Sequence, residues 1–182
     1  METIIFERRF DPPIQLDDVL DMYRQATWCM EQYRVLHATS LLSRDGRRLT
    51  CVFAAPDAEA VRSVAHQLGV AFERCWPSTV HAPPDFRSNA ALTTPEAALV
   101  VVERRFGDAV ELKALQDVED RGAWCLEQHR VHFLRSYFAL DRRQMLCLYA
   151  APDAESVHVA QRQAGMPFAD AWPALVYETS AA

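Results

Sequence analysis

The 182-residue sequence lacks the features of a membrane, secreted or disulfide-rich protein. Its five cysteines are odd in number and include no CxxC pair, which does not suit a disulfide framework and favours a reducing compartment. No apolar run approaches the ~18 residues of a membrane-spanning helix, and the opening METIIFERRF carries charges where a signal peptide has an apolar core. We therefore expect a cytoplasmic protein with no membrane partner.

An excess of positive charge and the established catalytic motifs are also missing. The formal net charge is -6 at pH 7, which argues against a nucleic-acid partner. The sequence has no phosphate-binding loop, zinc-protease helix or nucleophile elbow, so no motif assigns a reaction. With 50% hydrophobic and 24% charged residues and only five glycines, the composition is that of a compact folded protein.

The sequence does contain an internal repeat. The octet WCMEQYRV at Trp28–Val35 returns as WCLEQHRV at Trp124–Val131, an offset of 96 residues (124 minus 28). ERRF, AAPDAE and WP recur at the same offset. A repeat of this length can fold as a small domain. We predict a domain over residues 1–80, a Pro-, Ser- and Thr-containing linker over 81–98 and a second domain over 99–182.

Each repeat shows the same order of predicted elements. A β-like run such as TIIFERRF precedes a helical pattern, two strands joined by a turn, a second helix and a last strand through Trp-Pro. This order, β-α-β-β-α-β, predicts an α+β chain of two tandem ferredoxin-like domains. Because two helices cover only one face of each antiparallel sheet, we expect the sheets to pack face to face as a pseudo-dimer, like a dimeric α/β barrel. Further homo-oligomerisation is an open possibility.

Strand alternation in the second repeat suggests a ligand-binding face, because residues two apart point the same way. Leu146 and Leu148 suit packing under the helices. The set that we expect on the other face, in contact with a ligand, is Glu103, Phe133, Arg135, Tyr137, Cys147 and Tyr149. Glu103 and Arg135 could hold an anionic ligand or form a structural ion pair, and Cys147 could equally be a small core residue.

The first repeat offers a different set by the same alternation. Its members are Glu7, His37, Thr39, Leu41, Cys51 and Phe53. A Glu, a His and a Cys on adjacent strands could ligate a borderline metal, so Glu7, His37 and Cys51 are the candidate metal ligands. The structural alternative is a hydrogen-bonded His37 and a Cys51 that only fills the core.

The repeated octet falls at the end of the first helix of each repeat. We expect Trp28 and Trp124 to anchor that helix to the sheet. The alternative is that this corner lines the rim of a pocket between the two domains.

Several of these stretches also resemble a known family. ERRF, WCLEQHRV, FLRSYFALDRRQMLCLYAAPDAESV and AQRQAGMPFADAWPA resemble the DUF4242 family, small bacterial ferredoxin-like proteins described as nickel-binding. The second repeat matches over nearly its whole length, whereas the first replaces FLRSY with HATSL. The resemblance implies a ferredoxin-like fold, pairing of two units and a site for Ni(II) or a related divalent metal.

Three functions are compatible with this sequence. The first is a binding protein that holds a transition metal or a small ligand in the space between the two domains. The second is a cofactor-free enzyme that uses Glu103, Arg135 and Tyr137 in the same space. The third is an interaction protein whose second domain seals the first. We rank binding above catalysis.

Overall fold

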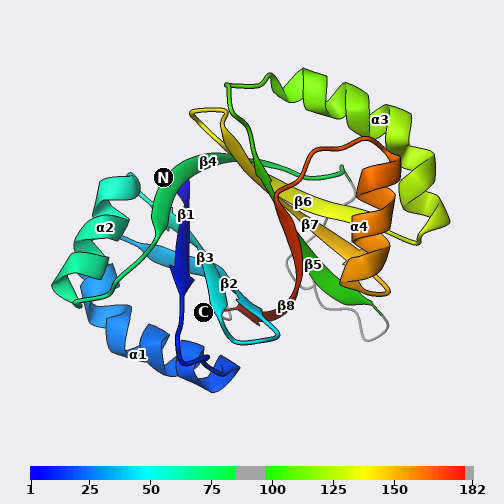
Figure 1. The fold of residues 1–182 in the computed structure, drawn as a ribbon. Coiled ribbons are helices and arrows are strands. Elements are labelled where there is room, and N and C mark those ends of the chain that lie inside the picture. The colour runs from blue at the N-terminus through cyan, green and yellow to red at the C-terminus, as the bar shows by residue number, and fades with distance from the viewer. Residues whose placement is uncertain (85–96, 179–182) are drawn as a thin grey trace. The chain divides into compact units, whose positions relative to one another are not determined.

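A computed structural model describes residues 1–84 and 97–178, and it confirms two tandem βαββαβ repeats (Figure 1). The first repeat comprises β1 (Glu2–Arg9), α1 (Leu16–Gln32), β2 (Leu36–Ser43), β3 (Arg48–Ala55), α2 (Ala58–Gln67) and β4 (Arg74–His81). The second comprises β5 (Ala98–Arg105), α3 (Leu112–Gln128), β6 (His132–Ala139), β7 (Gln144–Ala151), α4 (Ala154–Gln163) and β8 (Asp170–Glu178). The 96-residue offset of the sequence therefore relates the elements one to one.

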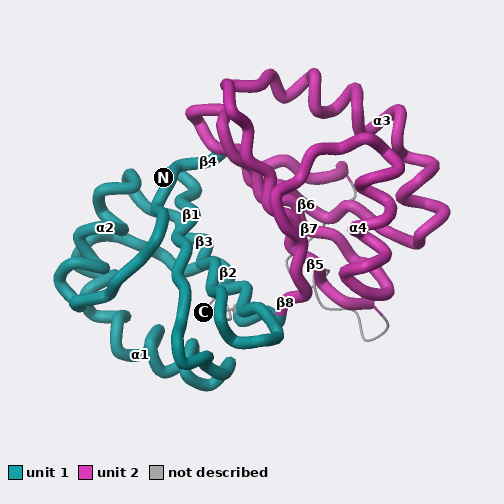
Figure 2. Tube along the Cα trace, viewed as in Figure 1, with its two compact units in different colours: residues 1–78, 175–182 teal, residues 79–174 magenta. Residues whose placement is uncertain are grey.

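The chain forms two compact units, which Figure 2 shows in different colours. Unit 1 contains residues 1–78 and 175–182, and unit 2 contains residues 79–174. Most of the predicted linker, residues 85–96, lies outside the described residues, so the domain bounds stay a prediction. In the part of the chain that the structure describes, no helix is long and apolar enough to cross a membrane.

The strands of each unit pair in the ferredoxin-like order. In unit 1, β1 lies between β3 and β4, and β3 also pairs with β2, all antiparallel. In unit 2, β5 lies between β7 and β8, and β7 also pairs with β6. In each unit both helices lie on one side of the sheet (Figure 1). The core of unit 1 joins Val19, Val61 and Val64 of the helices to strand residues such as Phe6.

A bulge in the first strand after each long helix changes which side chains share a face. In unit 1 the register shifts between His37 and Thr39, and in unit 2 it shifts between Phe133 and Arg135. The extra residue breaks the period of two, so His37 faces the helices together with Ser40, three residues later. The alternation that we used for the sequence therefore holds only on one side of each bulge.

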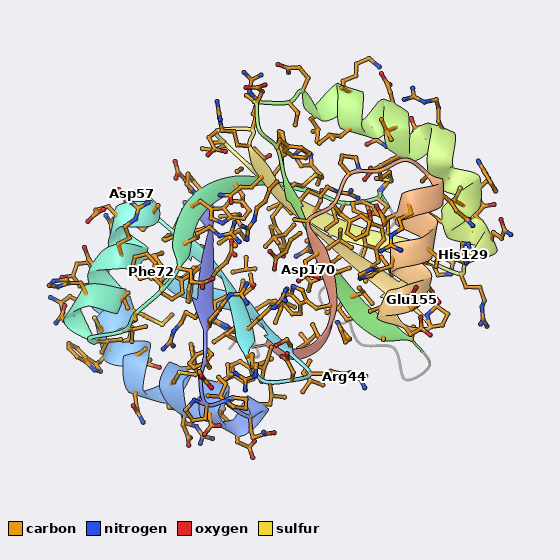
Figure 3. All side chains as sticks on the ribbon, viewed as in Figure 1. Arg44, Asp57, Phe72, His129, Glu155 and Asp170 are labelled. Atoms are coloured by element: carbon orange, nitrogen blue, oxygen red, sulfur yellow. The ribbon has the colours of Figure 1, made fainter. Side chains whose placement is uncertain are left out.

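The second helix of each repeat begins and ends as its sequence indicates. The Asp57 carboxylate accepts a hydrogen bond from the backbone N–H of Ala60 at 2.8 Å and caps α2 (Figure 3). Asp153 caps α4 in the same way. Gly69 and Gly165 follow these helices with φ of 64° and 68°, a left-handed conformation that glycine adopts without strain.

The repeated octet is the C-terminal cap of the first helix in each repeat. Arg34 has a φ of 55°, and the N–H of Val35 donates to the carbonyl of Met30 at 2.8 Å, which closes the helix in a Schellman motif. Arg130 and Val131 repeat this geometry. The buried members of the octet are the cysteines and valines, together with Met30 of the first copy: Cys29, Met30, Val35, Cys125 and Val131.

The prediction that the octet tryptophans anchor the helix was wrong. Trp28 and Trp124 are 55% and 61% exposed. Cys29 and Cys125, the next residues on the helices, are completely buried instead. Adjacent helical residues point about 100° apart, so the small thiol takes the position towards the sheet and the indole is left in solvent.

Candidate functional site

A cavity of about 180 Å³ lies inside unit 1, between its two helices and the sheet. Most of its wall is apolar and comes from side chains such as Phe6, Val19, Met30, Leu49, Val61 and Val64. The exposed residue Gln25 also lines the cavity, so the cavity reaches the surface beside α1. Besides Tyr23 and Gln25 of α1, the polar side chains of its wall are Arg8, His37, Ser40 and Cys51 of the strands. A largely apolar cavity with a few polar groups on its wall is typical of a small-molecule site.

Three of these polar groups form a chain of hydrogen bonds. Nε2 of His37 lies 2.8 Å from Oγ of Ser40, and the same oxygen lies 3.0 Å from Sγ of Cys51. The β2 bulge makes the chain possible, because it brings His37 and Ser40 to one face opposite Cys51 of β3. Two of the predicted metal ligands, His37 and Cys51, are therefore close together.

Burial keeps both end groups of this chain uncharged at neutral pH. Desolvation lowers the pKa of His37 to about 4, so its ring is neutral. Desolvation also raises the pKa of Cys51 to about 11, so its thiol is protonated. Aromatic rings surround the imidazole: Tyr23, Phe53 and Tyr177 have ring centroids 5.1, 5.8 and 5.6 Å away.

Arg8 is the only arginine among the residues that line the cavity. Its Nε donates to the carbonyl oxygen of Ala71 at 3.1 Å, and one of its terminal nitrogens donates to Sδ of Met22 at 3.1 Å. Its guanidinium also lies 4.6 Å from the centroid of the Phe10 ring. Partial burial lowers the pKa of Arg8, while the nearby Cys51 opposes that shift.

The equivalent arginine of unit 2, Arg104, is 2% exposed and surrounded by polar partners. It donates to Oε1 of Gln161 at 2.7 Å, to the hydroxyl of Tyr149 at 3.2 Å and to Sγ of Cys147 at 3.4 Å. Its guanidinium also lies 4.0 Å from a carboxylate oxygen of Glu119. Burial raises the pKa of this carboxyl, and Arg104 opposes the rise.

Substitutions between the repeats explain the difference in packing. At the 96-residue offset, Gln161, Tyr149 and Glu119 correspond to Ala65, Phe53 and Tyr23. The space that the Gln161 side chain occupies beside Arg104 is empty beside the methyl group of Ala65, which lines the cavity. The sequence patterns pointed to Tyr149 but not to Arg8, Arg104, Gln161 or Glu119, although aligning the two repeats shows where they differ.

Glu7 does not lie with His37 and Cys51, so its expected position was wrong. Glu7 pairs with Thr50 in the β1–β3 ladder, whereas Cys51 pairs with Phe6, and neighbours along a strand point to opposite faces. The Glu7 carboxylate accepts a hydrogen bond from Nε1 of Trp76 at 2.7 Å and forms an ion pair with Arg74. Thr39 and Leu41 share this face.

The predicted ligand face of unit 2 is also divided between the two faces. Phe133, Cys147 and Tyr149 belong to the core under the helices, whereas Leu146 and Leu148 lie on the opposite face. This is the reverse of the expected arrangement, because alternation alone does not say which of two faces the helices cover. The members of the predicted set on the face away from the helices are Glu103, Arg135 and Tyr137.

Each of these three residues has polar contacts within unit 2. A terminal nitrogen of Arg135 donates to the Tyr137 hydroxyl at 3.4 Å. Glu103 accepts from Nε1 of Trp172 at 3.0 Å and pairs with Arg105 at 3.3 Å. Because β7 separates β5 from β6, the backbone of Glu103 lies two strand spacings, roughly 10 Å, from that of Tyr137.

Comparison with known families accounts for the repeat. The family model described as nickel responsive protein SCO4226-like matches residues 5–77 and again residues 101–173. The chain belongs to this family. Members are recognised over one βαββαβ unit, so this SCO4226-like chain carries the family's unit twice. No curated protein sequence matches the chain.

Solved structures resemble the SCO4226-like chain in fold. A mutant of chlorite dismutase from Candidatus Nitrospira defluvii has 12% identity and a TM-score of 0.54, with 96% of this chain and 90% of that one covered. The same enzyme in complex with imidazole has 12% identity and a TM-score of 0.50, with 96% and 88% covered. At this identity the likeness shows the fold alone.

The described residues do not fit a nickel centre built from several side chains of this chain. Residues 1–84 and 97–178 contain no group of three or more His, Cys, Asp and Glu side chains placed to hold one ion. Of the predicted ligands, His37 and Cys51 offer one nitrogen and one sulfur beside Ser40. Glu7, the third predicted ligand, is on the other face of the sheet.

Proposed function

We propose that this SCO4226-like protein binds a small molecule in the cavity of unit 1. The observation that carries this proposal is the cavity itself, about 180 Å³ of space with an apolar wall and polar groups on one side. An apolar protein cavity of about 150 Å³ is large enough to bind benzene. The ligand is therefore the size of a single aromatic ring with a polar substituent.

The repeat supports a binding role for this space. Close packing is the ordinary state of a protein core, and an unfilled cavity lowers stability. Unit 2 fills the equivalent position with Gln161, which Arg104 and Tyr149 surround. The first repeat carries Ala65 there, together with the hydrogen-bonding groups of His37 and Ser40. A smaller side chain next to buried hydrogen-bonding groups is expected in a binding site. A core that had only lost packing would not be expected to carry those polar groups.

An NMR titration with benzyl alcohol tests this proposal. Benzyl alcohol joins one apolar ring to one hydroxyl group, which matches the composition of the cavity wall. We expect saturable shifts in the signals of Val61, Val64 and Met30 and none in the matching residues of unit 2. Shifts spread evenly over the surface, or no shifts, would contradict the proposal.

The second repeat supplies a matched control variant. Changing Phe53 to Tyr and Ala65 to Gln places the side chains of unit 2 in unit 1 and fills the cavity. We expect this double variant to fold and to lose at least about tenfold in affinity for benzyl alcohol. Unchanged affinity would place the ligand elsewhere.

Binding of a transition metal is the second candidate function. The favourable observation is that His37 and Cys51 lie on either side of the Ser40 hydroxyl, which gives one imidazole and one thiol, donors that suit nickel and related ions. The remaining ligands would come from water or a small molecule. Glu7 of the predicted set lies on the other face of the sheet and would not bind the ion. Titration with nickel, followed by mass spectrometry of the native protein, tests this function. Stoichiometric nickel that is lost in His37→Ala supports it, and no bound nickel contradicts it.

Four finer expectations remain proposals. We place the protein in the cytoplasm, which the five cysteines support because none of them forms a disulfide. We equate the nickel-binding DUF4242 family with the SCO4226-like family on the strength of the repeated motifs. A catalytic role for Glu103, Arg135 and Tyr137 stays a proposal, which their common position on the face away from the helices supports. The ligand role predicted for Phe133, Cys147 and Tyr149 would require access under the helices of unit 2.

A further inference from the structure

We infer that the cavity of unit 1 takes a small carboxylate, which Arg8 binds. This inference rests on the proposed small-molecule function and adds the chemical class of the ligand. It starts from the equivalence of Arg8 and Arg104, which are 96 residues apart and occupy the same position on β1 and β5.

The two arginines differ in whether a carboxylate of the protein lies beside the guanidinium group. Arg104 has Glu119 of α3 at 4.0 Å, in addition to its hydrogen bonds to neutral groups. The residue of α1 that corresponds to Glu119 is Tyr23, which lines the cavity. The first repeat thus keeps the cation and lacks the equivalent anion.

The contacts of Arg8 do not neutralise its charge. Among the described residues its partners are the Ala71 carbonyl oxygen, the Met22 sulfur and the Phe10 ring, and none of them is an anion. A half-buried guanidinium has lost part of its hydration, and a carboxylate is the partner that its planar donors fit best. A ligand carboxylate in the cavity would supply the charge that Glu119 supplies in unit 2.

The other groups of the cavity favour an anion over a cation. The ring of His37 is neutral, and the Ser40 hydroxyl can donate a hydrogen bond to a carboxylate oxygen. The lining residues include Arg8 as their one charged side chain, and no Asp or Glu is among them. The apolar remainder of the wall accommodates a ring or a short hydrocarbon chain.

Dissociation constants for three probes of similar shape test this inference. Benzoate, benzyl alcohol and benzylamine present a negative, a neutral and a positive group on the same ring. At neutral pH and low salt, we expect benzoate to bind the wild-type chain at least about tenfold more tightly than benzyl alcohol, and benzylamine to bind most weakly. Equal affinities for benzoate and benzyl alcohol would overturn the inference and leave the proposed function intact. No binding of either probe would overturn both.

Two variants identify the charge responsible, and a third is the control. Arg8→Met removes the cation, and Tyr23→Glu supplies an internal carboxylate as in unit 2. Each should abolish the preference for benzoate while benzyl alcohol still binds. Arg9→Met removes an exposed arginine that pairs with Glu73 outside the cavity and should change nothing. A benzoate preference that survives in both Arg8→Met and Tyr23→Glu would contradict the role of Arg8.

Discussion

The surroundings of Arg8 and Arg104 differ although the two residues occupy equivalent positions in the two units. Arg104 is enclosed by Gln161, Tyr149 and Glu119. Unit 2 also has a cavity, of about 320 Å³, which Glu119, Phe133 and Met145 help to line, but Arg104 is not among its lining residues. Arg8 faces a cavity of about 180 Å³. The backbone elements match at a constant offset, so the difference comes from side chains alone. A repeated fold can therefore keep an arginine at the same position in both copies while a few substitutions fill the space beside it in one copy and open that space in the other.

The largest expected effect comes from removing each arginine in turn. Arg104→Met leaves the Glu119 carboxylate and several polar groups without their partner, so we expect the free energy of unfolding to fall by about 3–5 kcal/mol. Arg8→Met loses only contacts with neutral groups and should cost about 1 kcal/mol. Urea unfolding of both variants measures the difference. Equal losses would show that the two arginines play the same structural role.

Acidification should sharpen the comparison through His37, whose counterpart in unit 2 is Phe133. Burial lowers the pKa of His37 to about 4, below the ordinary value near 6.5, so the folded state binds the proton less readily than the unfolded state. Its contribution to stability is complete above pH 6.5 and is lost as the pH falls towards 4, by up to about 3 kcal/mol.

The variant His37→Phe isolates this effect. It places the residue of the second repeat in the first and removes the titrating group. Urea unfolding between pH 7 and pH 4 should show a smaller loss of stability than in the wild type. The same pH dependence in both proteins would mean that His37 does not cause it.

The buried tryptophan–glutamate pairs should respond alike, because here the two units agree. Nε1 of Trp76 donates to Glu7, and Nε1 of Trp172 donates to Glu103, at 2.7 and 3.0 Å. Substitution of either tryptophan by Phe removes a hydrogen bond to a buried carboxylate and should cost about 2 kcal/mol in each unit. Thermal unfolding of the two variants would contradict this equivalence if one substitution were harmless.

The smallest effect is expected at the exposed tryptophans of the octet. Trp28→Gln and Trp124→Gln change side chains that are more than half exposed, so each should alter the free energy of unfolding by less than about 0.5 kcal/mol. Losses above about 1.5 kcal/mol in urea unfolding would restore the idea that these side chains anchor the helix.

The sequence was sufficient to predict the fold but not the faces of the strands. The constant offset, the strand patterns and the capping residues such as Asp57 and Gly69 are local signals, and the structure confirms the elements that they predict. The bulges after His37 and Phe133 carry no comparable signal, since a bulge depends on pairing with a partner strand. Every face assignment that crossed a bulge was therefore unreliable.

The candidate site was only partly predictable for a related reason. His37 and Cys51 were selected for their chemistry, and the structure brings them together. Arg8 was passed over because a single arginine at the end of a strand is unremarkable in sequence. Its importance follows from what its neighbours lack, and Tyr23 and Ala65 become neighbours only when the helices pack on the sheet. The packing of the two sheets against each other stays a prediction.

The most direct test of the account is a crystal structure of the chain under xenon pressure. Xenon enters apolar cavities that water leaves empty and scatters strongly enough to be located. We predict a xenon atom in unit 1, between Met30, Val61 and Cys51, and none beside Cys147 in unit 2. Xenon at neither position, or equally at both, would contradict the claim that the space beside Arg8 is open while the equivalent space beside Arg104 is filled.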